Sequence, residues 1–289
     1  MRALLFIPIL FITACGSSSE PGDAPPVVWP LSKSTTMDTL NDGYGPRELS
    51  GGYDFHRGLD MPAPTGTPIY APLGGTVVRV EEALPGDSLE RLGKFVIIAH
   101  DPHNGVDVHQ MSFQHMNSFS VTLNQRVEKG QQIGTVGNSG VGINTEHLHM
   151  GYFIGNNDGL IKRLNSRNAL RLLPYTHIDY GVSLTKSGSD LVLVLSQNPK
   201  SLDAVRIRLV PNDQTEVVLD FETREGMDVT DDDINPYGNI LITPAPFDQN
   251  DTIFQNTITF QTLYAATTSA EIFITDAKGT VHPYTFSDL

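Results

Sequence analysis

Two short motifs in this 289-residue chain carry residue types that suit a metal ion: His56-Arg57-Gly58-Leu59-Asp60 and His147-Leu148-His149. Imidazole and carboxylate groups are zinc ligands, and a site with three protein ligands keeps a fourth position open for water or substrate. Structural zinc sites are instead closed by four ligands, usually rich in cysteine, and the single cysteine here is Cys15. The motifs therefore predict a catalytic site for one zinc ion per chain, which would activate water for hydrolysis.

The second motif is expected to lie on a β-strand, because an apolar and aromatic run follows it from Met150 to Ile154. Residues two apart in a strand point to the same face. His147 and His149 should therefore project together, while Leu148 points into the opposite layer. Both histidines can bind a metal, or one can bind it while its neighbour handles protons.

His56 and Asp60 are four residues apart, and on a helix they would share a face. A helix is disfavoured here because Gly58 lies between them and Pro62 follows closely. We expect a loop that enters a short strand and presents both side chains to one ion.

The surrounding sequence consists of short β-type runs broken by glycine and proline. Two strands are expected around a Gly-Gly turn in residues 69–80, and another in residues 94–100. Similar runs follow at 113–116 and 127–140. This pattern is typical of an antiparallel sheet with tight turns.

With these motifs in order, the chain resembles the lysostaphin/LytM-type zinc metallopeptidases, which cut peptides of the bacterial cell wall. The resemblance covers residues 40–155. It rests on residues 43–47 (Gly-Tyr-Gly-Pro-Arg), 56–60 (His-x-Gly-x-Asp), 68–77 (Pro-Ile-Tyr-Ala-Pro-Leu-Gly-Gly-Thr-Val), 113–116 (Phe-Gln-His-Met), 127–140 and 147–149 (His-Leu-His).

The resemblance implies that His56, Asp60 and His149 bind the zinc ion. It places His147 beside the metal without binding it, and His115 opposite, on a neighbouring strand. Histidine suits proton transfer because its ordinary pKa is close to neutral pH. We assign His147 as general base and His115 as transition-state stabiliser or acid, and the sequence also allows the two roles to be exchanged.

The remaining histidines and the acidic runs have simpler interpretations. We expect a solvated hairpin loop rather than a second metal site around His100, His103 and His109. His177 and His282 have no partners at useful sequence spacing. The acidic run 228–235 lacks the glycine turn of an EF-hand, because Pro236 stands where that turn is needed.

The N-terminus is typical of a bacterial lipoprotein signal. Arg2 is followed by a short apolar core at 4–12, and the residues before Cys15 resemble a lipobox. We expect a signal peptide at 1–14, a lipid anchor on Cys15 and a flexible tether at 15–26. Gly16 after the cysteine favours, by resemblance to Gram-negative lipoproteins, the outer membrane. The protein would then lie on the periplasmic side of the cell envelope.

The chain length and a change of pattern near residues 175–180 predict two domains. Residues 27–175 would form the zinc peptidase domain, with helical character in 156–173. Residues 180–289 alternate apolar and polar residues between turns, which predicts an all-β sandwich-like accessory domain. The fold class is therefore mainly β, with an antiparallel LytM-type domain and a β-sandwich-like domain.

Charge narrows the choice of partners. The chain has a net charge of −14, and most of the excess acid lies beyond residue 180. Nucleic acid is excluded as a partner because it requires a basic patch. A single cysteine excludes an internal disulfide. The accessory domain is a candidate for contacts with a protein partner.

The sequence thus predicts a zinc endopeptidase that hydrolyses cross-links or stem peptides of peptidoglycan during cell-wall remodelling. The alternative is a catalytically silent LytM-type regulator that activates a separate cell-wall amidase. By the resemblance, some relatives that act as such regulators have lost zinc ligands, whereas His56, Asp60 and His149 are all present here.

Overall fold

The computed structural model describes residues 27–31, 39–49, 51–155, 166–197, 202–222, 238–246 and 253–289. The expected signal peptide, Cys15, the tether and the acidic run 228–235 lie outside these residues. Within them, the prediction of a mainly β, antiparallel chain is confirmed. None of the helical segments in the described part combines the length and apolar character needed to cross a membrane.

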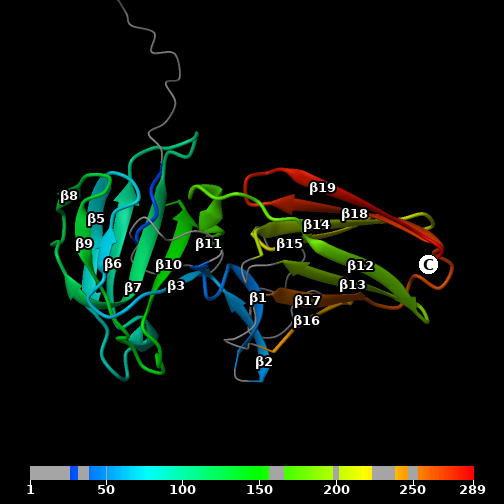
Figure 1. Ribbon diagram of the computed structural model, residues 1–289, viewed down its shortest axis with the longest axis horizontal. Helices are drawn as coiled ribbons and strands as arrows, with labels where there is room; N and C mark the ends of the chain where they lie inside the picture. The colour runs from blue at the N-terminus through cyan, green and yellow to red at the C-terminus, as the bar shows by residue number, and fades with distance from the viewer. Residues whose placement is uncertain are drawn as a thin grey trace, which may run out of the picture.

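A nine-stranded antiparallel sheet carries Asp60 and the His147-Leu148-His149 motif (Figure 1). Its main path runs β11-β10-β7-β6-β5-β8, with β3 paired to β10 and β9 linking β4 to β7. The strands are β3 (Gly58–Pro62), β4 (Pro68–Tyr70), β5 (Gly75–Glu82), β6 (Lys94–His100), β7 (His109–Phe119), β8 (Arg126–Val127), β9 (Gln132–Val136), β10 (His147–Ile154) and β11 (Ser166–Arg167).

Apolar side chains on this sheet are removed from water and hold its strands in register. Val77, Ile98, Phe113 and Leu148 are each 0% exposed, and they come from four different strands. Burial of such side chains is worth about 2 kcal/mol each. The core therefore fixes the strand that carries both histidines of the second motif.

A separate hairpin of β1 (Gly45–Leu49) and β2 (Gly52–His56) lies between the large sheet and the C-terminal strands (Figure 1). The residue before this hairpin, Tyr44, connects the two parts of the molecule. Its hydroxyl lies within hydrogen-bonding distance of two carbonyls, Ser166 O (3.1 Å) and Phe221 O (3.3 Å), and can donate to either. Asn256 Nδ2 also reaches Pro46 O at 3.5 Å.

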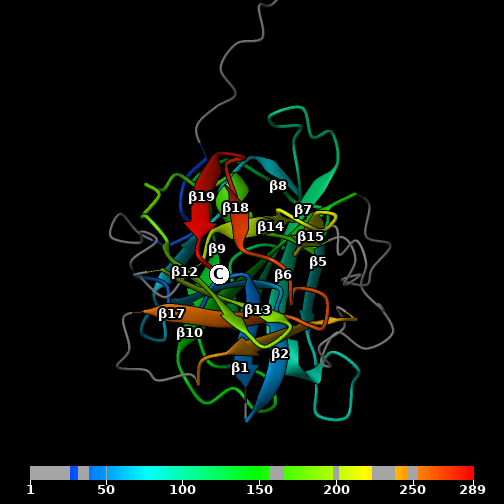
Figure 2. The same cartoon turned by 90° about the vertical axis from the view of Figure 1, so that its right-hand side faces the viewer.

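Two four-stranded antiparallel sheets form two layers in the C-terminal part, as the end-on view in Figure 2 shows. Their facing side chains include Leu193, Ile207, Ile258 and Ile272, all 0% exposed. Alternate burial along these strands agrees with the expected pattern. One sheet contains β12 (Gly181–Ser187), β13 (Asp190–Gln197), β17 (Phe254–Phe260) and β16 (Ile240–Pro244), and the other β15 (Val217–Asp220), β14 (Ala204–Pro211), β18 (Ser269–Asp276) and β19 (Val281–Ser287).

The expected helical character of residues 156–173 is wrong for its described part. Residues 166–167 form strand β11, and only the 3₁₀ turn η4 (Ala169–Arg171) follows. The side chain of Asn168 caps this turn by accepting from the Leu170 amide at 3.0 Å. Ser166 pairs with Phe153 of β10, so sheet pairing overrides the local helical preference.

Candidate metal centre

Three strand segments bring His56, Asp60 and His149 together. His56 is the last residue of β2, and Asp60 is central in β3. The expected loop at this position is therefore two strands separated by a single residue. β3 pairs with β10 so that Asp60 lies directly opposite His149. Backbone pairing thus places residues 89 apart in sequence side by side.

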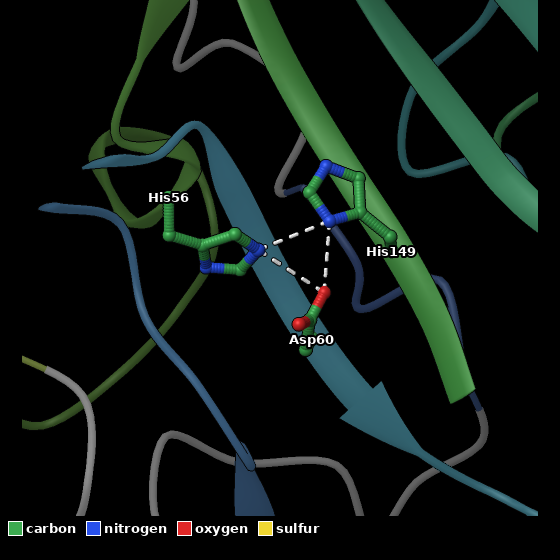
Figure 3. A group of neighbouring side chains, drawn as sticks. All are labelled: His56, Asp60 and His149. Carbon is green, nitrogen blue, oxygen red and sulfur yellow. Dashed lines mark hydrogen bonds and ion pairs between the residues drawn. The ribbon is translucent and has the colours of Figure 1, made fainter. Parts of the chain in front are cut away.

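The three ligand atoms form a compact triangle (Figure 3). His56 Nε2 lies 3.1 Å from His149 Nδ1 and 3.2 Å from Asp60 Oδ1. His149 Nδ1 lies 2.8 Å from Asp60 Oδ1. Tetrahedral ligands at about 2.0–2.1 Å from zinc are separated by roughly 3.3 Å. The donor set and its spacing therefore fit a zinc ion bound to all three residues.

The hydrogen bond of His56 to the backbone sets its tautomer. His56 Nδ1 donates to Gly43 O at 2.7 Å, which leaves the lone pair on Nε2 facing Asp60 and His149. A metal ligand commonly donates its second ring N–H in this way, and the bond fixes the ring orientation.

Electrostatics keep the aspartate charged. Burial alone would raise the pKa of Asp60, but the neighbouring imidazoles of His56 and His149 hold it well below its ordinary value. Burial and Arg47 act to lower the pKa of His56, and the carboxylates of Asp60 and Asp42 outweigh them and raise it. The site is thus a buried, anionic receptor for a cation.

Arg47 supports this site from β1 and was not singled out as a functional residue by the sequence reasoning. Its guanidinium pairs with Asp42 Oδ2 (2.6 Å), Asp54 Oδ2 (2.6 Å) and Asp60 Oδ2 (3.5 Å). It therefore contacts the outer oxygen of Asp60, while Oδ1 faces the two imidazoles. The sequence contained an indication of this role, because Arg47 is the last residue of the 43–47 motif on which the family resemblance rests.

Asp42 is the second residue that the sequence reasoning missed. It forms a β-bridge with Asp60 and is 4% exposed. Its Oδ2 lies 3.9 Å from His56 Nδ1. Nothing in the local sequence distinguishes it from a surface aspartate, because its role comes from pairing with a strand that follows later.

The alternation expected around His147 is present in β10. Leu148 is fully buried, whereas His147 and His149 lie on the other face. His147 Nε2 is 3.7 Å from Asp60 Oδ1, so the ring borders the ligand triangle. Its Nδ1 donates to Thr145 O at 3.0 Å, which leaves Nε2 as a proton acceptor.

His115 joins the site through an irregularity in β7. The register of β7 shifts against β6 and β9 near Met116, and His115 has a φ of +60°. A β-bulge of this kind turns a side chain toward a different direction, and positive φ is unusual for a residue other than glycine. The ring centroid of His115 lies 4.8 Å from His147 and 5.8 Å from His149.

The hydrogen bonding of His115 resembles that of His147. Its Nδ1 donates to Ser139 O at 3.1 Å, which leaves Nε2 as an acceptor. Burial, with the nearby charges of His149 and His147, lowers the pKa of His115 to about 3. The two residues therefore present two acceptor nitrogens beside the ligand triangle.

The expectation of a solvated loop around His100, His103 and His109 is wrong, because their exposed fractions are 6%, 6% and 1%. His100 Nδ1 donates to Gly74 O, and His109 Nε2 donates to Asp101 O. Burial lowers the pKa of His100 to about 4. These residues form no three-ligand group within the described ranges.

His177 and His282, which have no partners at useful sequence spacing, lie beside each other in the fold. Their rings stack with centroids 4.1 Å apart, and Asp276 lies beside them. The two histidines are more than 100 residues apart in the chain, so sequence spacing does not show that they are close in space.

Three possible ligand atoms on adjacent strands, bordered by two imidazoles, have the donor set of a candidate catalytic metal centre. Comparison with known proteins then shows what this region is similar to. Residues 54–159 match the model of peptidase family M23.

Individual relatives cover the same region. The cell division protein DipM of Caulobacter vibrioides is 33% identical over 121 residues, 42% of this chain and 17% of that protein. The peptidoglycan DD-endopeptidase ShyC of Vibrio cholerae is 30% identical over 119 residues, 40% of this chain and 24% of that protein. The chain thus matches less than a quarter of the length of either relative.

Among solved structures, the catalytic domain of the A109H mutant of the prophage-encoded M23 protein EnpA from Enterococcus faecalis is 30% identical. The match covers 48% of this chain and 93% of that chain, with a TM-score of 0.37.

Proposed function

We propose that this protein is a zinc-dependent endopeptidase that hydrolyses cross-links or stem peptides of peptidoglycan. The observation that carries the proposal is the triangle of His56, Asp60 and His149 with His147 and His115 on its border. A silent regulator has no need to retain this complete set. The name of ShyC as a peptidoglycan DD-endopeptidase supports the same substrate class.

The site residues would divide the work as follows. His56, Asp60 and His149 hold the ion, and a zinc ion bound there supplies Lewis-acid activation of water and of the scissile carbonyl. Arg47 balances the charge on the outer oxygen of Asp60. The rest of the chemistry requires a group that takes a proton from water and a group that returns one to the leaving amine.

We assign the proton transfer to His147. Its Nε2 is an acceptor, because Nδ1–H is engaged with Thr145 O, and it lies next to the ligand triangle. Once protonated, the same nitrogen can donate to the leaving amine. His115, held through Nδ1 by Ser139 O, presents its acceptor Nε2 beside His147 and would orient the attacking water and stabilise the transition state by accepting a hydrogen bond from it.

The domain division and the cellular location are also part of this proposal. Residues 27–175 would form the peptidase domain, and residues 180–289 an acidic accessory domain that contacts a protein partner. Acylation of Cys15 would anchor the chain in the outer membrane, with the site facing the wall. Replacing Cys15 by serine should abolish incorporation of a labelled fatty acid; unchanged labelling would rule out the anchor.

The test of the proposed activity is digestion of isolated murein sacculi by the chain from residue 27 onward. Stoichiometric zinc and release of muropeptides with a newly cleaved peptide bond are expected. Mass spectrometry of the products would identify the bond. A zinc-loaded protein that releases nothing, but stimulates a cell-wall amidase, would support the regulator instead.

A further inference from the structure

A second group of metal-binding residue types lies in the C-terminal part of the molecule. One ligand atom from each of His177, Asp276 and His282 lies within 4.8 Å of the other two. His177 belongs to the segment between η4 and β12, Asp276 ends β18, and His282 lies on β19. The two imidazole planes are inclined by only 24°.

Asp276 is built to present one oxygen to the histidines. The residue is 2% exposed. Its Oδ1 accepts from the amides of Lys278 (2.8 Å) and Thr280 (3.0 Å). Its Oδ2 lies 3.0 Å from His282 Nε2 and 3.9 Å from His177 Nδ1. The turn after β18 thus fixes the carboxylate with Oδ2 directed at both rings.

Asp203 also uses its two carboxylate oxygens for different contacts. It is 0% exposed, and its Oδ1 accepts from Tyr180 OH (2.6 Å) and Gln197 Nε2 (3.0 Å). Its Oδ2 accepts from His177 Nδ1 at 2.9 Å. The other ring nitrogen, His177 Nε2, is buried and makes no hydrogen bond within the described part of the chain. Asp203 thus holds the His177 ring through Nδ1, and Nε2 is the nitrogen left without a hydrogen-bond partner among the described residues.

The charge at this group is incompletely balanced. Among the described residues, the ion pairs of Asp203 and Asp276 are made with imidazoles, not with arginine or lysine. The nearby ammonium group of Lys278 interacts electrostatically with Asp276, but it donates to Arg171 O and Leu173 O. Buried carboxylates require a compensating charge, and a divalent cation would supply it.

We propose that His177, Asp276 and His282 bind a second divalent metal ion, with Asp203 orienting His177. Imidazole and carboxylate ligands together suit zinc and similar transition metals, whereas calcium and magnesium prefer oxygen ligands alone. Three protein ligands would leave a further position on the ion for water, and we assign the ion a stabilising role because of the segments that it would join.

The position of these three residues indicates which parts of the molecule the ion would hold together. His177 lies in the segment that leads from the large sheet into the C-terminal sheets, while Asp276 and His282 lie on one β-hairpin. A metal held by all three would tie this connection to the hairpin. Lys278, on the same hairpin, already bonds to Arg171 O and Leu173 O at the end of the first part. The ion would therefore stiffen the joint between the two parts.

Metal analysis of the tag-free full chain tests the proposal. After zinc loading and dialysis, wild type should retain two equivalents, His282→Gln one, and His56→Ala one. The double variant should retain none. The matched control is Asp179→Asn, which removes an exposed carboxylate from the same segment and should keep two. Equal zinc content in wild type and His282→Gln would overturn the proposal, whereas unchanged content in His56→Ala would count only against the first site.

A second measurement begins with the group intact and the first site removed. In the His56→Ala variant, one equivalent of Co²⁺ should produce visible absorption bands of a bound ion, and zinc should raise the thermal midpoint. Asp276→Asn in this background should abolish both effects while its circular dichroism spectrum stays unchanged. A His56→Ala variant that binds no cobalt and gains no thermal stability from zinc would refute the second site without any change at its ligands.

Discussion

Gly58 lies between the two ligands of the first motif, and replacing it by alanine should displace His149. A Cβ atom at Gly58 would lie 2.5 Å from His149 Nε2, 2.6 Å from its Cε1 and 2.7 Å from Met150 O. Non-bonded heavy atoms require about 3.5 Å, so the ring or the strand must move by about 1 Å. The imidazole can swing aside, but the carbonyl of Met150 belongs to the paired strand β10.

The expected cost follows from that displacement. A misplacement of about 1 Å in a catalytic site can lower the rate about 100-fold. We therefore expect Gly58→Ala to reduce kcat about 100-fold on isolated sacculi and to weaken zinc binding in a competition titration with a chelator. Both effects should appear with an unchanged circular dichroism spectrum.

The matched control is Gly52→Ala on the adjacent strand β2. A Cβ atom there would meet only Leu49 O, at 3.9 Å, which is an ordinary contact. Zinc affinity and turnover should remain those of wild type. Wild-type zinc affinity and kcat in Gly58→Ala would refute the packing argument, because the close approach of β3 to His149 would then have no effect on the site.

Two further predictions concern stability. Arg47→Gln leaves Asp42 and Asp60 buried without their cation, so the free energy of unfolding should fall by about 3–5 kcal/mol. The control is Arg126→Gln, which removes an exposed ion pair with Asp101 and should lower the free energy of unfolding clearly less in the same denaturant titration. Equal losses in the two variants would contradict the role of burial. His100 has its pKa lowered to about 4 by burial, so its contribution is complete above pH 6.5 and is lost as the pH falls toward 4, because the unfolded chain takes up the proton first. The free energy of unfolding of chelator-treated wild type should fall between pH 6.5 and 4, and in His100→Asn this fall should be smaller by about 3 kcal/mol. The same dependence of the unfolding free energy on pH in both proteins would show that His100 is not a buried neutral group.

The sequence predicted the parts of the site that depend on local alternation. The apolar run after His149 was enough to place His147 and His149 on one face and Leu148 on the other. Glycine and proline punctuation likewise indicated the short antiparallel strands of residues 69–100. These features depend on neighbours in the chain, which a sequence shows directly.

The parts that were missed depend on contacts between distant segments. His115 reaches the site because of a bulge in β7 and a positive φ, and only the family resemblance indicated its place. Asp42 joins through a bridge to Asp60. His177 meets His282 only after the C-terminal strands pair. No local periodicity encodes such pairings.

The central claim is that His149 holds the ion while His147, two residues away on the same face, moves the proton. The most direct test is the rate of peptide-bond cleavage in sacculi by zinc-loaded His147→Ala, with the zinc content of the first site measured on the same sample. A fall in rate of at least about 100-fold is expected, with zinc retained at that site, whereas His149→Ala should lose both the zinc of that site and activity. Full turnover by His147→Ala would contradict the account.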